Sequence, residues 1–303
     1  MARAVSAARS ALRATARRRS LLSSLAQRWA LSLLIGGLAG CGETPPPRQP
    51  ALPDAQAPAE AGWRLTWSDE FEGEAGTPPD PARWTHDVGG DGWGNDQLEF
   101  NTDRVENAAL DGQGNLALTA RREAFGGRAF TSARIKTKGL FSQRYGRFEA
   151  RLRLPRGQGI WPAFWLLGDD IDQVGWPACG EIDVMEFRGQ RVWESTGAVH
   201  GPGYAGGQAL PGAFDEIADL TADFHVYAVE WDEDAIVWSV DGVPFHRVFP
   251  TSLPPGGRWA FDHPFFILLN VAVGGSYVGA PDDSTPLPQQ MLVDHVRVYE
   301  RAP

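Results

Sequence analysis

Hydrophobic and polar residues alternate along several short segments of the chain. The pattern has a period of two in residues 147–154, 235–240 and 292–299, which is the period of a half-buried β-strand. Asp241-Gly242 follows the second of these segments and predicts a tight hairpin turn. The 35 Gly and 23 Pro suit a turn-rich fold, and helical periodicity over ten or more residues occurs only near the N-terminus. The pattern therefore predicts an all-β sandwich.

Three carboxylates interrupt the otherwise apolar residues 180–186. Side chains two residues apart point to the same face of a strand, so Glu181 and Asp183 share a face. Glu186 is out of phase by one residue and joins them only if the strand contains an extra, bulged residue, most simply at Val184–Met185. Like charges on one face repel each other and move their pKa values apart. A strand selected for stability alone would avoid this arrangement, whereas an enzyme that needs one ionised and one protonated carboxyl group would use it.

The spacing of these acids suits glycoside hydrolysis, which uses a pair of carboxyl groups. With the bulge discounted, Glu181 and Glu186 are four strand steps apart, or roughly 13 Å between their Cα atoms. Two glutamates that lean toward each other can reach the separation of about 5–5.5 Å that retaining enzymes use. The estimate leaves open the roughly 6.5–9.5 Å of inverting enzymes. Taken alone, the motif is equally compatible with a solvated polar strand face.

The residues around the acidic strand resemble a known family. The similarity lies in residues 161–168 (Trp-Pro-Ala-Phe-Trp-Leu-Leu-Gly), Trp176-Pro177, residues 180–186 and residues 197–204 (Gly-Ala-Val-His-Gly-Pro-Gly-Tyr). Together these segments are similar to glycoside hydrolase family 16, in particular to its bacterial laminarinase branch of endo-β-1,3-glucanases. The resemblance extends over about residues 63–301. It implies a concanavalin A-like β-jelly-roll sandwich, an open substrate cleft on the concave sheet, and retention of anomeric configuration.

The resemblance also implies roles for individual residues. Glu181 would attack the anomeric carbon, and Glu186 would act first as acid and then as base. Asp183 would raise the pKa of a neighbour or share a proton with Glu181. The amide and aromatic side chains expected to contact sugar are Asn95, Trp161, Trp165, His200 and Tyr277.

Some positions depart from the family pattern. Tyr277-Val278 stands where Trp-Pro is usual, which predicts a smaller sugar platform with a phenol group. Asp96, Gln97 and Glu99 replace Asn, Glu and Gln, which leaves open whether they tune sugar subsites or rearrange the loop. Four other tryptophans are expected in the core, namely Trp67, Trp84, Trp231 and Trp238.

Metal and thiol chemistry have little support in the sequence. Catalysis of this type needs no cofactor, but the family often holds a structural Ca²⁺ on the convex side, and Glu70 and Asp294 match its usual location. There is no Cys/His spacing typical of zinc. Cys179 is expected to be a small core residue beside the acidic strand.

The N-terminal residues predict export. Residues 1–40 contain seven Arg, no acidic residue and a short apolar run, which indicates a signal peptide rather than a membrane span. Leu38-Ala39-Gly40-Cys41 resembles a bacterial lipobox, so Cys41 is expected to carry lipid. Residues 41–62 are rich in Pro and Ala and predict a tether, which leaves residues 63–303 as the catalytic domain. We therefore expect a monomeric lipoprotein attached to the outer membrane or the cell surface.

Charge limits the range of partners. The chain carries a net charge of −10, and loss of the signal peptide with its seven Arg would make the charge −17. Such a protein is unsuited to binding nucleic acid or an anionic polysaccharide by electrostatic attraction. A neutral β-glucan fits better.

Several activities share these features. The main prediction is a retaining endo-β-1,3-glucanase, and the same scaffold serves β-1,3-1,4-glucanases, agarases and transglycosylases. The bulged motif with Met185 is similar to the laminarinase and agarase branches rather than to the unbulged lichenases. A non-catalytic carbohydrate-binding module is the alternative from another class, although binding alone does not require three crowded acids.

Overall fold

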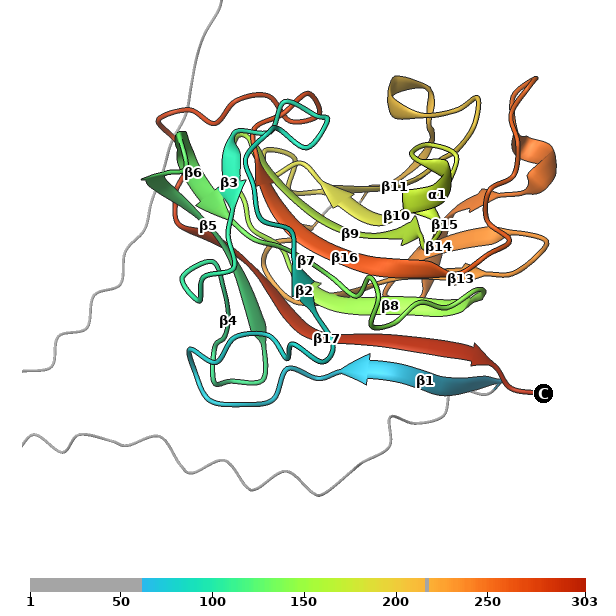
Figure 1. The fold of residues 1–303 in the computed structure, drawn as a ribbon, viewed down its shortest axis with the longest axis horizontal. Helices are drawn as coiled ribbons and strands as arrows, with labels where there is room; N and C mark the ends of the chain where they lie inside the picture. Colours follow the sequence, from blue (N-terminus) through green and yellow to red (C-terminus); the bar gives the residue numbers. More distant parts are fainter. Residues whose placement is uncertain (1–61, 216–217) are drawn as a thin grey trace, which may run out of the picture. The chain divides into compact units, whose positions relative to one another are not determined.

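Two β-sheets stacked face to face make up the fold (Figure 1). The computed structural model describes residues 62–215 and 218–303. Nearly all strand pairs are antiparallel, and the exception is the parallel pair of β3 (Glu99–Asn101) and β6 (Arg128–Ser132). In Figure 1 the two sheets curve in the same direction, and one sheet lies in the hollow of the other.

The outer sheet has ten strands and forms the convex side. Its order is β15 (Val243–Val248), β14 (Ile236–Val240), β13 (His225–Trp231), β8 (Gly146–Arg153), β17 (Gln289–Arg301), β5 (Leu116–Phe125), β6 and β3. In addition, β1 (Trp63–Asp69) pairs with β17, and β4 (Ala108–Leu110) pairs with β5.

The inner sheet has seven strands and forms the concave side. Its order is β12 (Leu210–Asp215), β11 (Glu194–His200), β10 (Glu181–Phe187), β9 (Ile160–Gly168), β16 (Phe265–Val273), β7 (Arg134–Lys136) and β2 (Thr85–His86). Because β10 and β16 flank β9, sequence-distant segments meet in the middle of this sheet.

The three alternating segments all form strands, as predicted. They correspond to β8, β14 and β17, and the predicted turn at Asp241-Gly242 joins β14 to β15. Asp241 has a left-handed φ of 49°, and Gly242 follows with 76°, which is the backbone that such a tight hairpin needs. The described residues also contain short helical turns that the pattern did not predict: α1 (Ile171–Val174), η1 (Gly206–Gln208) and η2 (Pro250–Ser252).

The core lies between the sheets. Side chains that alternate toward the interior from both sheets are fully buried, among them Phe148 on β8 and Phe164 on β9. Three of the four tryptophans expected there are buried (Trp84, Trp231 and Trp238), and Trp67 is half-buried against the same cluster. Cys179 is fully buried as well, beside the inner sheet, as expected for a structural thiol.

The predicted signal peptide and Cys41 lie outside the described residues, as does all but the last residue of the predicted tether. Within residues 62–215 and 218–303, no helix has the length and apolar character needed to cross a bilayer.

Candidate active site

A bulge in β10 brings the three acids to one face. Asp183 is paired with Ala198 of β11 and Glu186 with Thr196, so Val184 and Met185 together face the single residue Gly197. The register against β9 shifts in the same interval. Val184 and Met185 both point into the core, which restores the phase of Glu186. The predicted position of the bulge is therefore confirmed.

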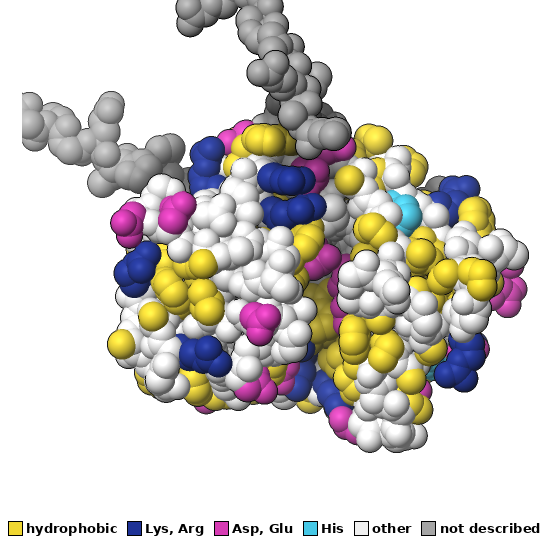
Figure 2. Space-filling model, turned by 90° about the horizontal axis from the view of Figure 1, so that it is seen from above, with side chains coloured by type: hydrophobic (Ala, Val, Ile, Leu, Met, Phe, Trp, Pro, Cys, Tyr) yellow, Lys and Arg dark blue, Asp and Glu magenta, His cyan; other side chains and the backbone are white. Residues whose placement is uncertain are grey.

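The acids lie at the floor of a cleft of about 790 Å³ on the hollow face of the inner sheet. Figure 2 shows this face from above, with a groove whose floor carries hydrophobic and acidic side chains. All eight residues predicted for catalysis or sugar contact line the cleft: Asn95, Trp161, Trp165, Glu181, Asp183, Glu186, His200 and Tyr277. The sequence thus identified side chains that come from five separate segments and meet at one site.

Glu181 is held by an indole that the sequence analysis left without a role. Trp176 Nε1 donates a hydrogen bond of 2.9 Å to Glu181 Oε2. Trp176 is 49% exposed, and its ring lies 6.0 Å from the His200 ring, centroid to centroid. Trp176 therefore both orients one carboxylate and offers an open aromatic surface at the rim. Its presence in the Trp176-Pro177 part of the family motif was the available signal.

His200 contacts two of the acids. Its Nε2 lies 3.0 Å from Asp183 Oδ2 and 3.7 Å from Glu181 Oε1. The backbone N–H of Gly206 donates to His200 Nδ1 at 2.9 Å, so Nδ1 acts as the acceptor and the proton of the neutral ring belongs on Nε2. The Nε2 proton of His200 therefore lies on the side of the ring that faces Asp183.

These three side chains are also the one group of acids, His or Cys within the described ranges that is compact enough to share a metal ion. The ligand atoms of Glu181, Asp183 and His200 lie within 4.8 Å of one another. A metal ion could bind Nε2 only if the ring proton were on Nδ1. The hydrogen bond from the Gly206 N–H requires Nδ1 to be unprotonated, so the proton is on Nε2 instead. The arrangement therefore disfavours a metal at His200 Nε2.

Glu186 has its own indole donor. Trp161 Nε1 donates to Glu186 Oε1 at 3.1 Å, and the Trp161 ring lies 5.0 Å from the Tyr277 ring. Only 8% of Trp161 is exposed, so it orients Glu186 more than it offers a platform. The Tyr277 hydroxyl is 2.7 Å from Thr196 Oγ1, and the Arg188 guanidinium covers its ring. The phenol of Tyr277 is thus tied to the inner sheet.

Trp165 belongs to a second aromatic cluster. Its Nε1 donates to Asn270 Oδ1 at 2.8 Å. The Arg134 guanidinium lies 4.7 Å from the Trp165 ring and 4.8 Å from the Trp93 ring, and its Nε is 3.0 Å from Asp87 Oδ2. Arg134 thereby links the Trp93 loop to the sheet. Sequence reasoning missed Arg134, because a single arginine on a short strand carries no distinctive signal.

The three departures from the family pattern lie in the loop that holds Asn95 and at the start of β3, which follows it. Asn95 is exposed on it, and its carbonyl accepts the N–H of Ser276 at 2.8 Å. Gln97 lines the cleft. Glu99 is fully buried below the loop, where it accepts the N–H of Val273 at 2.8 Å, and burial raises its pKa to about 7. Gln97 can therefore affect a subsite, whereas Glu99 supports the backbone.

Burial dominates the electrostatics of the three acids. It raises the pKa of Glu181 to about 8 and that of Asp183 to about 7. It also raises the pKa of Glu186 to about 8, and the charge of Asp183 adds to the shift in both glutamates. The site therefore retains protons near neutral pH, which keeps a protonated carboxyl group available as the acid of the reaction.

We expect Glu186→Gln to stabilise the fold at high pH. The pKa of Glu186 is raised in the folded state to about 8, so the folded state disfavours its ionised form. This penalty is absent below the unfolded pKa of about 4.3, grows as pH rises, and is complete above about 8. Gln cannot ionise, so the melting temperature of the variant should match the wild type near pH 4 and exceed it at pH 8.5. We expect the free energy of unfolding at pH 8.5 to rise by at least about 1 kcal/mol, which corresponds to an increase in melting temperature of roughly 2–4 °C.

Thermal melts at several pH values measure this difference. Glu233→Gln is the matched control, because Glu233 is exposed in the turn between β13 and β14. If the difference in melting temperature between Glu186→Gln and the wild type did not change with pH, the raised pKa of Glu186 in the folded state would be contradicted.

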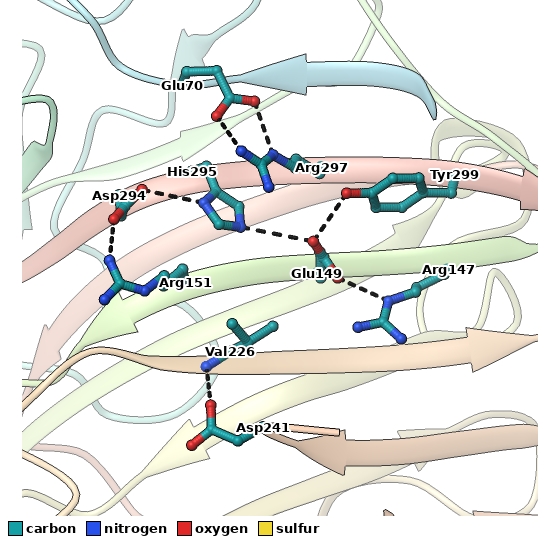
Figure 3. Close-up of polar contacts among 10 residues, drawn as sticks. All are labelled: Glu70, Arg147, Glu149, Arg151, Val226, Asp241, Asp294, His295, Arg297 and Tyr299. Carbon is teal, nitrogen blue, oxygen red and sulfur yellow. Dashed lines mark hydrogen bonds and ion pairs between the residues drawn. The ribbon is translucent and has the colours of Figure 1, made fainter. Parts of the chain in front are cut away.

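The two expected calcium ligands lie on the convex side, Glu70 directly after β1 and Asp294 on β17, and both are paired with arginine (Figure 3). Arg297 donates Nε and Nη2 to the two carboxylate oxygens of Glu70 at 3.0 and 2.7 Å. Asp294 pairs with Arg151, and its Oδ1 is 3.2 Å from His295 Nδ1. Because each carboxylate already has a cationic partner, the pair does not fit a Ca²⁺ ion bound through these groups. A structural calcium remains only a prediction.

The chain is similar to several characterised proteins. Residues 94–291 match the model of glycosyl hydrolases family 16. A beta-glucanase of Rhodothermus marinus is 44% identical over 249 residues, which cover 78% of this chain and 85% of that protein. Glucan endo-1,3-beta-glucosidase A1 of Niallia circulans is 37% identical over 266 residues, which cover 80% of this chain and 39% of the relative.

The fold agrees with the sequence match. The laminarinase catalytic domain of Thermotoga maritima MSB8 superposes with a TM-score of 0.75 at 43% identity, over 80% of this chain and all of that domain. The predicted β-jelly-roll sandwich is thereby confirmed. Because the family model spans more than half of the chain and the acidic strand lies within it, the chain belongs to glycosyl hydrolases family 16.

Proposed function

We propose that this enzyme cleaves internal bonds of β-1,3-glucan with retention of configuration. The observation that carries the proposal is the bulged strand, which brings Glu181, Asp183 and Glu186 to one face at the floor of an open cleft. The names of the relatives support the linkage, since they describe β-glucanases, endo-1,3-β-glucosidases and laminarinases.

The first step forms a covalent intermediate. A Glu181 oxygen attacks the anomeric carbon while protonated Glu186 gives its proton to the glycosidic oxygen, and the bond between that oxygen and the anomeric carbon breaks. The Trp176 N–H fixes the direction of the Glu181 carboxylate, and the Trp161 N–H does the same for Glu186. The raised pKa of Glu186 suits an acid, and because the pKa of Glu181 is raised equally, the division of roles rests on the family resemblance.

The second step releases the sugar. Water attacks the anomeric carbon, gives a proton to the Glu186 carboxylate and displaces Glu181, so that two inversions produce net retention. Asp183 influences both steps through its charge, and His200 Nε2 lies 3.0 Å from its carboxylate. His200 and Asp183 thus lie together beside the nucleophile.

A panel of polysaccharides tests the substrate. Incubation with laminarin, curdlan, lichenan and agarose, followed by measurement of new reducing ends, should give the highest catalytic efficiency on laminarin and release oligosaccharides of mixed length. Preferential cleavage of agarose or lichenan would overturn the proposed linkage. Binding of laminarin without new reducing ends would instead identify a binding module, and products longer than an added oligosaccharide substrate would identify transglycosylation.

We further propose that the enzyme is tethered to a bacterial membrane by lipid on Cys41. The support is the Leu38-Ala39-Gly40-Cys41 sequence after an apolar run, followed by a Pro- and Ala-rich segment. Two or more acyl chains give stable anchoring, whereas one chain gives only marginal binding.

We expect the full chain, expressed in a bacterium, to fractionate with membranes and Cys41→Ser to be blocked in lipobox processing. Detection of the protein in separated membrane and soluble fractions measures the first, and mass spectrometry of the mature N-terminus measures the second. Wild-type protein found in the medium with an unmodified Cys41 would contradict the tether.

A further inference from the structure

The bulge that aligns the acids is held from the opposite sheet. Trp238 lies on β14 of the outer sheet and is fully buried, with no part of its side chain in the cleft lining. Its indole Nε1 crosses the core and donates a hydrogen bond of 2.8 Å to the backbone carbonyl of Asp183. Asp183 is the last regularly paired residue before the bulge. The hydrogen bond thus contacts the backbone where the phase of the strand changes.

Gly197 makes room for this contact. It is the single residue of β11 that faces the bulge, and a Cβ atom there would lie 2.4 Å from Trp238 Cδ1 and 3.1 Å from the Asp183 carbonyl oxygen. Any side chain at this position would therefore push the indole away from the carbonyl. The absence of a side chain at Gly197 is a geometric requirement of the Trp238 contact.

A second glycine, on the neighbouring strand β12, also makes room for a ring of the outer sheet. Gly212 on β12 is paired with Gly197, and a Cβ atom there would lie 2.2 Å from the ring of His246. The His246 and Trp238 rings are adjacent, with centroids 4.8 Å apart. Two paired glycines of the inner sheet thus form a slot that receives two rings of the outer sheet. The slot restrains the indole from the side away from the bulge.

We propose that Trp238 is a positioning residue for the reaction: its N–H fixes the bulge carbonyl and thereby the placement of Asp183 and Glu186 relative to Glu181. The proposal rests on the catalytic roles proposed above for these acids. A shift of strand register by one residue would turn Glu186 into the core, so the bulge needs a specific restraint. Without the N–H, the carbonyl of Asp183 loses a hydrogen-bond partner in the core between the sheets.

Loss of the Trp238 hydrogen bond is expected to lower kcat rather than to weaken substrate binding. A displacement of about 1 Å at reacting groups can lower the rate by about 100-fold. The sugar contacts lie on other elements, at Asn95, Trp165 and Tyr277, so they should remain in place. A merely structural tryptophan would lower stability without this separation of kcat from KM.

The test replaces Trp238 by β-(3-benzothienyl)alanine, which preserves the ring shape but has sulfur in place of the N–H. Trp238→Phe is the natural-residue companion. Trp231 provides the matched control, because it is also buried on the outer sheet and also donates through Nε1 to a backbone carbonyl, that of Phe261, at 3.0 Å. The same two replacements at Trp231 therefore remove an equivalent hydrogen bond whose acceptor is not on β10.

We expect the Trp238 analogue to lower kcat on laminarin by at least tenfold with KM changed less than twofold, and to shift the pH–rate profile by at least half a pH unit. The Trp231 analogue should retain the wild-type kcat and pH–rate profile. Both the Trp238 and the Trp231 analogues should have a lower melting temperature than the wild type. An unchanged kcat in the Trp238 analogue, or an equal loss in the Trp231 analogue, would overturn the proposal.

The analogue keeps the test decisive if Trp238→Phe fails to fold, because it fills the same volume. Failure of this inference is also distinguishable from failure of the proposed function. The latter would appear as wild-type activity in Glu181→Gln, whatever the Trp238 variants do.

Discussion

Glu181→Gln should reduce turnover of laminarin to below about 1% of the wild-type value, a loss of roughly 100-fold or about 2.7 kcal/mol in the barrier. Gln keeps the shape of the side chain but has no carboxylate to attack the anomeric carbon. The Trp176 N–H can still donate to the amide oxygen, so the cleft should keep its form. Initial rates of reducing-end formation measure turnover, and calorimetric binding of laminari-oligosaccharides shows that the cleft is intact.

The matched control is again Glu233→Gln, which makes the same chemical change in an exposed turn. It should leave both rate and binding unchanged. Activity of Glu181→Gln well above 1%, with binding intact, would mean that another residue carries the attack and that the assignment of the nucleophile is wrong.

The part of the site that depends on the period of a single strand could be predicted from the sequence. The phase argument required one extra residue between Asp183 and Glu186, and the structure has it at Val184–Met185. This inference worked because a strand has a fixed period of two, so an acid out of phase implies a definite change in the backbone. The hairpin at Asp241-Gly242 was predictable for a similar local reason.

Contacts between distant segments could not be predicted in this way. Arg134 and Trp93 meet Trp165 only because β7 and β9 both pair with β16 and the Trp93 loop folds over them. Trp238 was correctly expected in the core, but its hydrogen bond to the bulge depends on how the two sheets are stacked. No spacing along the chain encodes that stacking.

Ion pairs on the outer sheet could not be predicted from the sequence either. The resemblance placed Glu70 and Asp294 near a calcium site by position alone, yet Arg297 and Arg151 lie beside them in space. These arginines occupy β17 and β8, and their alternation on the strands gave no sign of which acid each would pair with. Ion pairs between neighbouring strands depend on register, which the structure supplies and the sequence pattern does not.

Glu186→Ala should have a different signature from the nucleophile variant. Loss of the acid should lower laminarin turnover by about 100-fold or more, because the glycosidic oxygen leaves without a proton. A laminari-oligosaccharide with a dinitrophenyl leaving group needs no such help, so the variant should still form the glycosyl-enzyme from it. The second step should then become slow, because water has no base.

Azide should restore that second step, because it is a nucleophile that needs no base. It displaces the Glu181 carboxylate from the anomeric carbon, so turnover of the dinitrophenyl substrate should rise with azide concentration and the product should be the β-glycosyl azide. In Glu181→Ala, azide would replace the missing nucleophile itself and give the α-glycosyl azide by a single inversion. The two anomers are distinguished by proton NMR, so the product alone tells which carboxylate attacks and which transfers protons. If Glu186→Ala gave the α product, the two roles would be reversed; if azide had no effect, Glu186 would not be the general base, and the chemistry proposed for this face of β10 would require another residue.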